Sequence, residues 1–159
     1  MFVGINPSTY SVARGHYFAR KQNRFWPAFS RSVLSEEVRR GLGRDQLGPE
    51  DDVRLPAFGF GFTDVVKVPS ANASSVTPAM YGEWVPRLQD RLRAAAPRVI
   101  CFHGVMAYRP FAKHALPAGE ETFAGARIFV APNPSPANAH FTLEDQVSAY
   151  DRLAAFLLS

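Results

Sequence analysis

Two copies of the tripeptide Asn-Pro-Ser stand where chemistry is readily built. Asn6–Ser8 follows the apolar run Met1–Ile5, and Asn133–Ser135 follows the apolar run Ile128–Ala131. If these runs are parallel strands, both tripeptides lie at carboxyl ends, where open α/β sheets bind their ligands. Asn-Pro is also a common way to begin a turn, which is the alternative interpretation of each copy. Its repetition at two strand ends favours two loops that face each other across one ligand site.

Cysteine and histidine are too sparse for several classes of site. The single cysteine, Cys101, excludes a disulfide framework, a CxxC redox pair, a four-cysteine zinc site and a four-cysteine iron–sulfur cluster. The four histidines are scattered and form no HExxH motif: His16, His103, His114 and His140. The Gly-rich P-loop signature is also absent. We therefore expect no metal, no cofactor and a reducing, cytoplasmic setting.

Length and charge limit the number of domains and the kinds of partner that the protein can have. The 159 residues predict one domain that spans residues 1–159. No apolar run approaches the ~18–20 residues of a membrane span. The 18 Lys and Arg residues exceed the 14 Asp and Glu residues, so the net charge is +4. This mild basicity is compatible with a nucleic-acid partner, and we expect a monomer.

Four short apolar runs have the composition of strands buried on both faces, because they are continuous rather than alternating. They are Met1–Ile5, Phe62–Val66, Val99–His103 and Ile128–Ala131. Helical periodicity lies between and after them, in three groups: Phe25, Trp26, Phe29 and Val33; Trp84, Val85, Leu88 and Leu92; and Leu143, Val147, Tyr150, Ala154 and Leu157. The alternation predicts a three-layer α/β/α sandwich with a mainly parallel central sheet.

Local signals complete this outline. Thr142 and Asp145 have the spacing of a capping box at the start of the last helix. The polar stretches Gly41–Pro56 and Lys67–Pro78 are rich in turn-forming residues, which predicts two surface loops. The first strand begins at Met1 itself, so we expect a short N-terminal segment to precede it in the complete protein.

The motifs that follow these strands resemble, in order, those of the mismatch-specific uracil/thymine DNA glycosylases, a family of the uracil-DNA glycosylase superfamily. The segments that carry the resemblance are Gly4–Ser8 (GINPS), Gly15–Ala19 (GHYFA), Asn23–Trp26 (NRFW), Gly61–Asp64 (GFTD), Phe102–Gly104 (FHG) and Pro132–Ser135 (PNPS). Each segment is weak evidence alone, but their common order over nearly the whole chain is strong evidence.

The resemblance implies a uracil-DNA glycosylase-like fold and a monofunctional DNA glycosylase of base excision repair, which works on the nucleoid. Such an enzyme hydrolyses the N-glycosidic bond of uracil flipped out of DNA, especially at G:U mismatches, with thymine or damaged pyrimidines as further substrates. Asn6 would orient the attacking water, because an amide accepts and donates hydrogen bonds but takes no proton. The classical uracil-DNA glycosylases carry Asp in this motif, so slower chemistry is expected here. No lysine stands at position 6, so a Schiff-base lyase step is not indicated.

Asp64 is the second candidate catalytic residue. A carboxylate beside the water acts as a general base or stabilises the positive charge that develops on the sugar. The alternative is that Asp64 pairs with Lys67 or caps a turn. The sequence leaves both interpretations open.

The loop after the first strand would bind the flipped base. In the family, the phenylalanine at the position of Phe18 stacks on the base, and Ile5, His16 and Tyr17 would line the same pocket. Base–aromatic stacking contributes ~1–3 kcal/mol, which is comparable with the cost of base flipping. The alternative for Phe18 is packing in the core, as we expect for Phe25 and Trp26.

The resemblance also implies a DNA-binding surface. Its candidate residues are Ser11, Arg14, Lys21, Asn133, Pro134, Ser135, Pro136 and Ala137. Arg20, Arg24 and Lys67 are further candidates for phosphate contacts, whereas Arg39, Arg40, Arg91 and Arg93 are expected on a solvated surface.

The second loop departs from the family pattern, in which Gly and a bulky apolar wedge often follow Asn-Pro-Ser. Pro136 lacks the backbone N–H that would read an orphaned guanine, and Ala137 is a small wedge. Both changes predict broader use of uracil opposite adenine or in single strands. Phe141 is an alternative wedge, although it is expected to begin the last helix. Two other classes remain: a non-catalytic nucleic-acid-binding domain of the same fold, and a small hydrolase of free nucleosides.

Overall fold

The central sheet of the computed structural model, which describes residues 1–159, has five strands in the order β2-β1-β3-β5-β4. The strands are β1 (Phe2–Gly4), β2 (Phe62–Asp64), β3 (Val99–His103), β4 (Thr122–Phe123) and β5 (Ala126–Ala131). Neighbours among β2, β1, β3 and β5 are parallel, and only β4 runs antiparallel to β5. The prediction of a mainly parallel sheet is confirmed, and the two-residue strand β4 was not foreseen.

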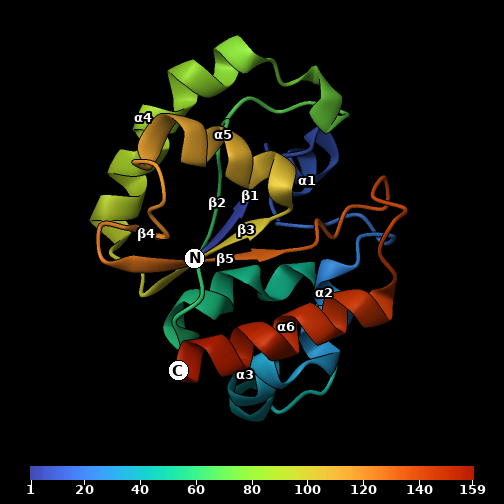
Figure 1. Ribbon diagram of the computed structural model, residues 1–159. Helices are drawn as coiled ribbons and strands as arrows, with labels where there is room; N and C mark the ends of the chain where they lie inside the picture. Colours follow the sequence, from blue (N-terminus) through green and yellow to red (C-terminus); the bar gives the residue numbers. More distant parts are fainter.

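Helices cover both faces of this sheet (Figure 1). On one face lie α4 (Pro78–Ala95) and α5 (Val105–Ala115), and on the other lie α2 (Phe25–Arg31), α3 (Glu36–Leu42) and α6 (Leu143–Leu158). The short helix α1 (Thr9–Arg14) follows β1. Single 3₁₀ segments span Val33–Ser35, Pro49–Phe58 and Ala73–Ser75. The three-layer sandwich is therefore confirmed. None of the helices combines the length and apolar character that a membrane crossing requires.

Each face of the sheet has its own apolar core, because successive strand residues point to opposite sides. Phe2 packs with Phe25 and Tyr150 on the α2–α6 side. Its neighbour Val3 packs with Leu88 and Phe111 on the α4–α5 side. All six are 3% exposed or less, and burial of side chains of this size contributes roughly 1.5–3 kcal/mol each. The two cores fix the strands whose carboxyl ends carry the Asn-Pro-Ser loops.

The long helices begin and pack as the pattern predicts. The Thr142 N–H donates to Asp145 Oδ2 at 2.8 Å and the Asp145 N–H donates to Thr142 Oγ1 at 3.1 Å, which confirms the capping box. In α4, Val85, Leu88 and Leu92 are buried. Lys67–Pro78 is mostly loop, as expected, with one 3₁₀ turn and the first residue of α4.

Gly41–Pro56 is not the surface loop that its polar composition predicts. The last turn of α3 lies inside this stretch, and a 3₁₀ helix begins at Pro49. Leu47 and Leu55 insert into the α2–α6 core, and the polarity of their neighbours hid them. Val33 was also misassigned, because the chain leaves α2 before this residue and its side chain is 59% exposed.

Helix α5 was missed because Pro110 lies in its middle. A proline has no N–H to donate to the carbonyl four residues earlier, here that of Met106. The hydroxyl of Tyr81, on α4, donates to this carbonyl at 3.5 Å. A contact between two helices thus partly replaces the hydrogen bond that the sequence removes.

Candidate active site

A cleft of about 1320 Å³ lies at the carboxyl ends of the parallel strands and includes residues of both Asn-Pro-Ser loops. Most of the predicted site residues line it: Ile5, Asn6, Ser11, His16, Tyr17, Phe18, Asp64, Asn133, Ser135, Pro136 and Ala137. Three others do not. Arg14 and Lys21 are exposed outside the cleft, and Pro134 is buried within the second Asn-Pro-Ser loop.

The side-chain amide of Asn6 is held in one orientation. Its Nδ2 donates to the Val68 carbonyl at 2.9 Å and to Ser70 Oγ at 2.7 Å. The Ser70 hydroxyl donates onward to the carbonyl of Asn72 at 2.8 Å, so its oxygen accepts from Asn6. Both N–H groups of the amide are thereby used. The remaining polar atom, the carbonyl Oδ1, is an acceptor on a residue that lines the cleft.

Asp64 ends β2 and lies beside Gly4 in the parallel register. The residue is 6% exposed, and its Oδ2 lies 3.3 Å from the ammonium of Lys67. Burial raises the pKa of the Asp64 carboxyl, and the charges of Lys67 and Arg91 oppose this rise. A buried carboxylate with a raised pKa in a cleft has the properties of a general base.

Two basic residues support Asp64 from different sides. Besides its contact with Asp64, the Lys67 ammonium lies 3.4 Å from the Tyr17 hydroxyl. Arg91, on α4, donates from Nη2 to the backbone carbonyl of Asp64 at 2.6 Å. Arg91 was expected on a solvated surface. It is instead half-buried, because the carbonyl at the end of β2 needs a donor that the sheet does not supply.

Phe18 has an unusual backbone conformation. Its φ of +54° lies in the left-handed region, which large side chains rarely adopt. Its ring is stacked on Phe25 with 4.4 Å between centroids and meets the ring of His103 edge-on at 5.5 Å. The ring therefore packs against the core, as one sequence interpretation expects, and it also lines the cleft. Stacking on a flipped base stays a prediction. A strained backbone conformation of this kind persists only where the surrounding contacts hold it, and such conformations are concentrated at active sites.

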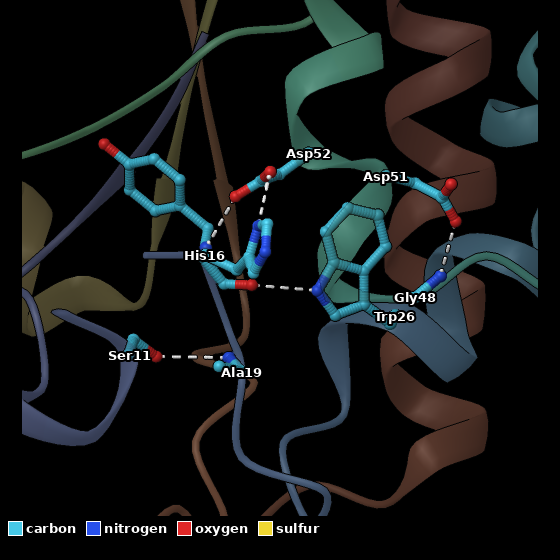
Figure 2. A network of polar contacts seen from close by, with 8 residues as sticks. Ser11, His16, Ala19, Trp26, Gly48, Asp51 and Asp52 are labelled. Atoms are coloured by element: carbon cyan, nitrogen blue, oxygen red, sulfur yellow. Dashed lines mark hydrogen bonds and ion pairs between the residues drawn. The ribbon is translucent and has the colours of Figure 1, made fainter. Parts of the chain in front are cut away.

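The segment before Phe18 is fixed by Asp52, a residue of the 3₁₀ helix. Asp52 Oδ1 lies 3.0 Å from His16 Nδ1, and Oδ2 accepts from the Tyr17 N–H at 2.9 Å (Figure 2). The Trp26 indole N–H donates to the Tyr17 carbonyl at 2.9 Å. One buried carboxylate thus fixes both His16 and Tyr17. The sequence did not identify Asp52, because only the fold brings it to this loop.

A second polar link joins α1 to the residue after Phe18. The hydroxyl of Ser11 accepts from the Ala19 N–H at 3.1 Å, as Figure 2 shows. Ser8 caps α1 by accepting from the Ser11 N–H at 3.0 Å. The Asn-Pro-Ser loop and the Phe18 loop are therefore coupled through α1.

The second Asn-Pro-Ser loop is held from behind by Arg24. Arg24 Nη2 lies within 3.2 Å of three carbonyl oxygens, those of Asn133, Ser135 and Asn138. The backbone N–H of Arg24 donates to the Pro134 carbonyl at 2.9 Å. From the sequence, Arg24 is a candidate for a phosphate contact. In the structure its guanidinium instead binds the protein's own backbone.

Phe141 does not begin the last helix, because Thr142 caps α6 and the helix begins at Leu143. Its side chain is 42% exposed and lines the cleft. Within the second loop, Pro136 and Ala137 are exposed.

At the floor of the cleft, His103 at the end of β3 is almost fully buried and its Nε2 lies 3.0 Å from the Tyr150 hydroxyl. Burial lowers the pKa of His103 to about 3, so its ring is neutral at physiological pH. No group of three or more His, Cys, Asp or Glu side chains is arranged to hold a metal ion.

A comparison with protein families agrees with this geometry. The family described as the uracil DNA glycosylase superfamily matches residues 1–154, which is nearly the whole chain.

Proposed function

Because this chain belongs to the uracil DNA glycosylase superfamily, whose members remove bases from DNA, we propose that it hydrolyses the N-glycosidic bond of uracil flipped out of DNA. We propose further that it acts as a monofunctional enzyme of base excision repair. The observation that carries this proposal is the fixed amide of Asn6, whose only uncommitted polar atom is an acceptor in a cleft that also contains Asp64 and Phe18.

The proposed reaction begins with a water molecule that donates one hydrogen bond to Asn6 Oδ1. The water oxygen forms a bond to C1′ of the deoxyribose while the bond from C1′ to the base nitrogen breaks. The electron pair of the broken bond leaves with the base, and Asp64 accepts the proton of the water. A positioned general base typically contributes about 10²–10⁴-fold to such a step.

Phe18 would stack on the extruded base, and Tyr17 and His16 would border it. Fixing Tyr17 and His16 through Asp52 reduces the entropy that the loop loses when the base enters. We expect Phe18→Ala to weaken binding of the flipped nucleotide by about 1–3 kcal/mol.

We propose a broad choice of substrate, which includes uracil opposite guanine, opposite adenine and in single strands. Pro136 offers no backbone N–H to a guanine, and Ala137 presents a small side chain. Activity confined to uracil opposite guanine would contradict this part of the proposal.

The test is cleavage of a labelled oligonucleotide that contains one uracil, in the three contexts, with EDTA present and alkali treatment afterwards. Breaks that need alkali indicate a monofunctional glycosylase, and activity in EDTA indicates that no dissociable metal is needed. Asn6→Ala is the matched variant, and we expect its single-turnover rate to fall by about 10²-fold or more, as when a positioned catalytic hydrogen bond is lost. DNA binding without cleavage by the unaltered protein would identify a non-catalytic binding domain instead.

A further inference from the structure

Strand β2 lies at one edge of the sheet, so β1 is its only strand neighbour. The N–H of Val65, just after β2, donates to the Gly4 carbonyl of β1 at 2.9 Å. Peptide groups alternate in direction along an extended chain, so the carbonyls of Phe62 and Asp64 point away from β1. No strand lies on that side to donate to them, and backbone carbonyls enclosed in a fold need a donor.

Two side chains take the place of the absent strand. The Tyr17 hydroxyl donates to the Phe62 carbonyl at 3.4 Å. Arg91 Nη2 donates to the Asp64 carbonyl at 2.6 Å. A hydrogen bond from an ionised donor is shorter and stronger than one between neutral groups. Arg91 is therefore the main restraint on the outer side of β2 at its carboxyl end.

Arg91 differs from the other arginines of α4, the helix that covers this part of the sheet (Figure 1). Arg87 is exposed and pairs with Glu83 one turn away, and Arg93 is exposed and pairs with Asp90. Arg91 instead points toward the sheet, and its Nε is enclosed without a hydrogen-bond partner. Enclosed polar atoms without a partner are rare in folded proteins and call for an explanation. The contact with Asp64 supplies one.

This contact fixes the backbone of the residue that we propose as the general base. Lys67 holds the carboxylate of Asp64 from the loop after β2, at 3.3 Å, and Arg91 holds its carbonyl from α4. A general base acts only within hydrogen-bond reach of the proton that it accepts. A displacement of about 1 Å can lower a rate about 10²-fold. The position of the Asp64 backbone therefore matters to the reaction as well as to the fold.

We propose that Arg91 is a positioning residue of the reaction, which holds the backbone of Asp64 so that its carboxylate meets the attacking water. The proposal rests on the proposed function and goes beyond it. It gives a part in the reaction to a residue of α4 that does not line the cleft.

The test is the single-turnover rate on single-stranded uracil DNA, measured across the pH range with enzyme in excess. For Arg91→Met we expect the rate to fall by about tenfold to a hundredfold, with unchanged affinity for the DNA, because Arg91 lies outside the cleft. Arg91→Lys keeps the charge and one donor and should recover most of the rate. Arg87→Met removes one charge from the exposed face of the same helix and should leave the rate unchanged.

The pH profile separates position from charge. The charge of Arg91 also opposes the rise in the pKa of Asp64, so its removal moves the acid limb to higher pH. A carboxylate out of place stays slow even where it is fully ionised, so the loss in Arg91→Met should persist on the plateau above the acid limb. A loss that disappears on the plateau would overturn the proposal, because Arg91 would then act through its charge alone.

A double-mutant cycle tests whether the effect passes through the carboxylate. Asp64→Asn keeps the carbonyl that Arg91 binds but has no general base. Adding Arg91→Met to Asp64→Asn should lower the rate no further, because the base to be positioned is gone. Equal losses in both backgrounds would show a merely structural role and would overturn the proposal.

A further readout does not depend on cleavage. The N–H groups of Val65 and Val66 donate to β1, and their hydrogen exchange reports how firmly the end of β2 is held. Exchange at both should be faster in Arg91→Met and unchanged in Arg87→Met. Unchanged exchange in Arg91→Met would overturn the positioning of Asp64 by Arg91. An unaltered protein that shows this exchange response but cleaves no uracil DNA would instead contradict the proposed function.

Discussion

The ammonium of Lys67 lies 3.3 Å from the carboxylate of Asp64, although Asp64 is almost completely buried. Burial raises the pKa of Asp64, and the nearby positive charges of Lys67 and Arg91 oppose this rise. The pair therefore sets the pH range in which Asp64 is ionised. Asp64 pairs with Lys67 and also lines the cleft, so the two sequence interpretations of Asp64 do not exclude each other.

Replacing Lys67 with Met should move the acid limb of the rate profile to higher pH. Without the ammonium, the pKa of Asp64 rises further, so less of the carboxylate is ionised at a given acidic pH. We expect the single-turnover rate on the acidic limb to fall by about tenfold, with recovery as the pH rises. Lys67→Arg should keep the profile. An identical profile for Lys67→Met would exclude an ionised Asp64 from the rate-limiting step.

Asp64→Asn should abolish most of the activity and yet raise the stability at neutral pH. The folded-state pKa of Asp64 is raised above its unfolded value, so its contribution to stability is present below the unfolded pKa. That contribution is lost as the pH rises through the folded pKa. Thermal unfolding at a series of pH values should show Asn more stable than Asp at neutral pH, with the difference shrinking towards acid. The opposite trend would show that the ion pair outweighs burial.

Arg24→Gln should release the second Asn-Pro-Ser loop. Hydrogen bonds from a charged group contribute about 1.5–3 kcal/mol each, and these are partly buried, so a clear loss of stability is expected. Hydrogen exchange in residues 133–138 should increase. The dependence of DNA binding on salt should keep its slope, because Arg24 binds backbone carbonyls. A slope reduced by about one would instead indicate a lost phosphate contact.

Asp52→Ala should loosen the loop that carries Phe18. The Tyr17 N–H and the His16 ring both lose their acceptor, which we expect to cost about 1–3 kcal/mol of stability. The KM should rise more than kcat falls, because the change affects the bound base more than the attacking water. Asp51→Ala, in which the neighbouring contact to Gly48 is lost, is the matched comparison and should leave KM unchanged.

The parts of the site that the sequence predicts are those whose signals are local. Asn6 and Asn133 come just after apolar strands, so their common edge of the sheet follows from strand direction, and Asp64 lies in the short strand beside them. Asp52 and Arg24 have no such signal. Their roles depend on which loops the fold brings beside them, and each acts on a segment far away in the sequence.

The elements of the fold also divide into those with a local sequence signal and those that depend on distant contacts. The capping box of α6 is a local pattern and was predicted from two residues. Helix α5 is interrupted by Pro110, and its compensating contact from Tyr81 lies 25 residues away. The buried leucines of Gly41–Pro56, Leu47 before the 3₁₀ helix and Leu55 within it, are separated by polar residues, so no apolar period marks this stretch.

The packing of Gly4 against Asp64 has a consequence for the redesign of this enzyme. A Cβ at position 4 would lie 2.8 Å from Asp64 Oδ1, which is too close for any side chain unless the carboxylate moves. The effect of a substitution at position 4 therefore depends on which residue stands at position 64. A library that varies residue 4 alone should yield only impaired enzymes, whereas one that varies residues 4 and 64 together gives access to new pocket shapes.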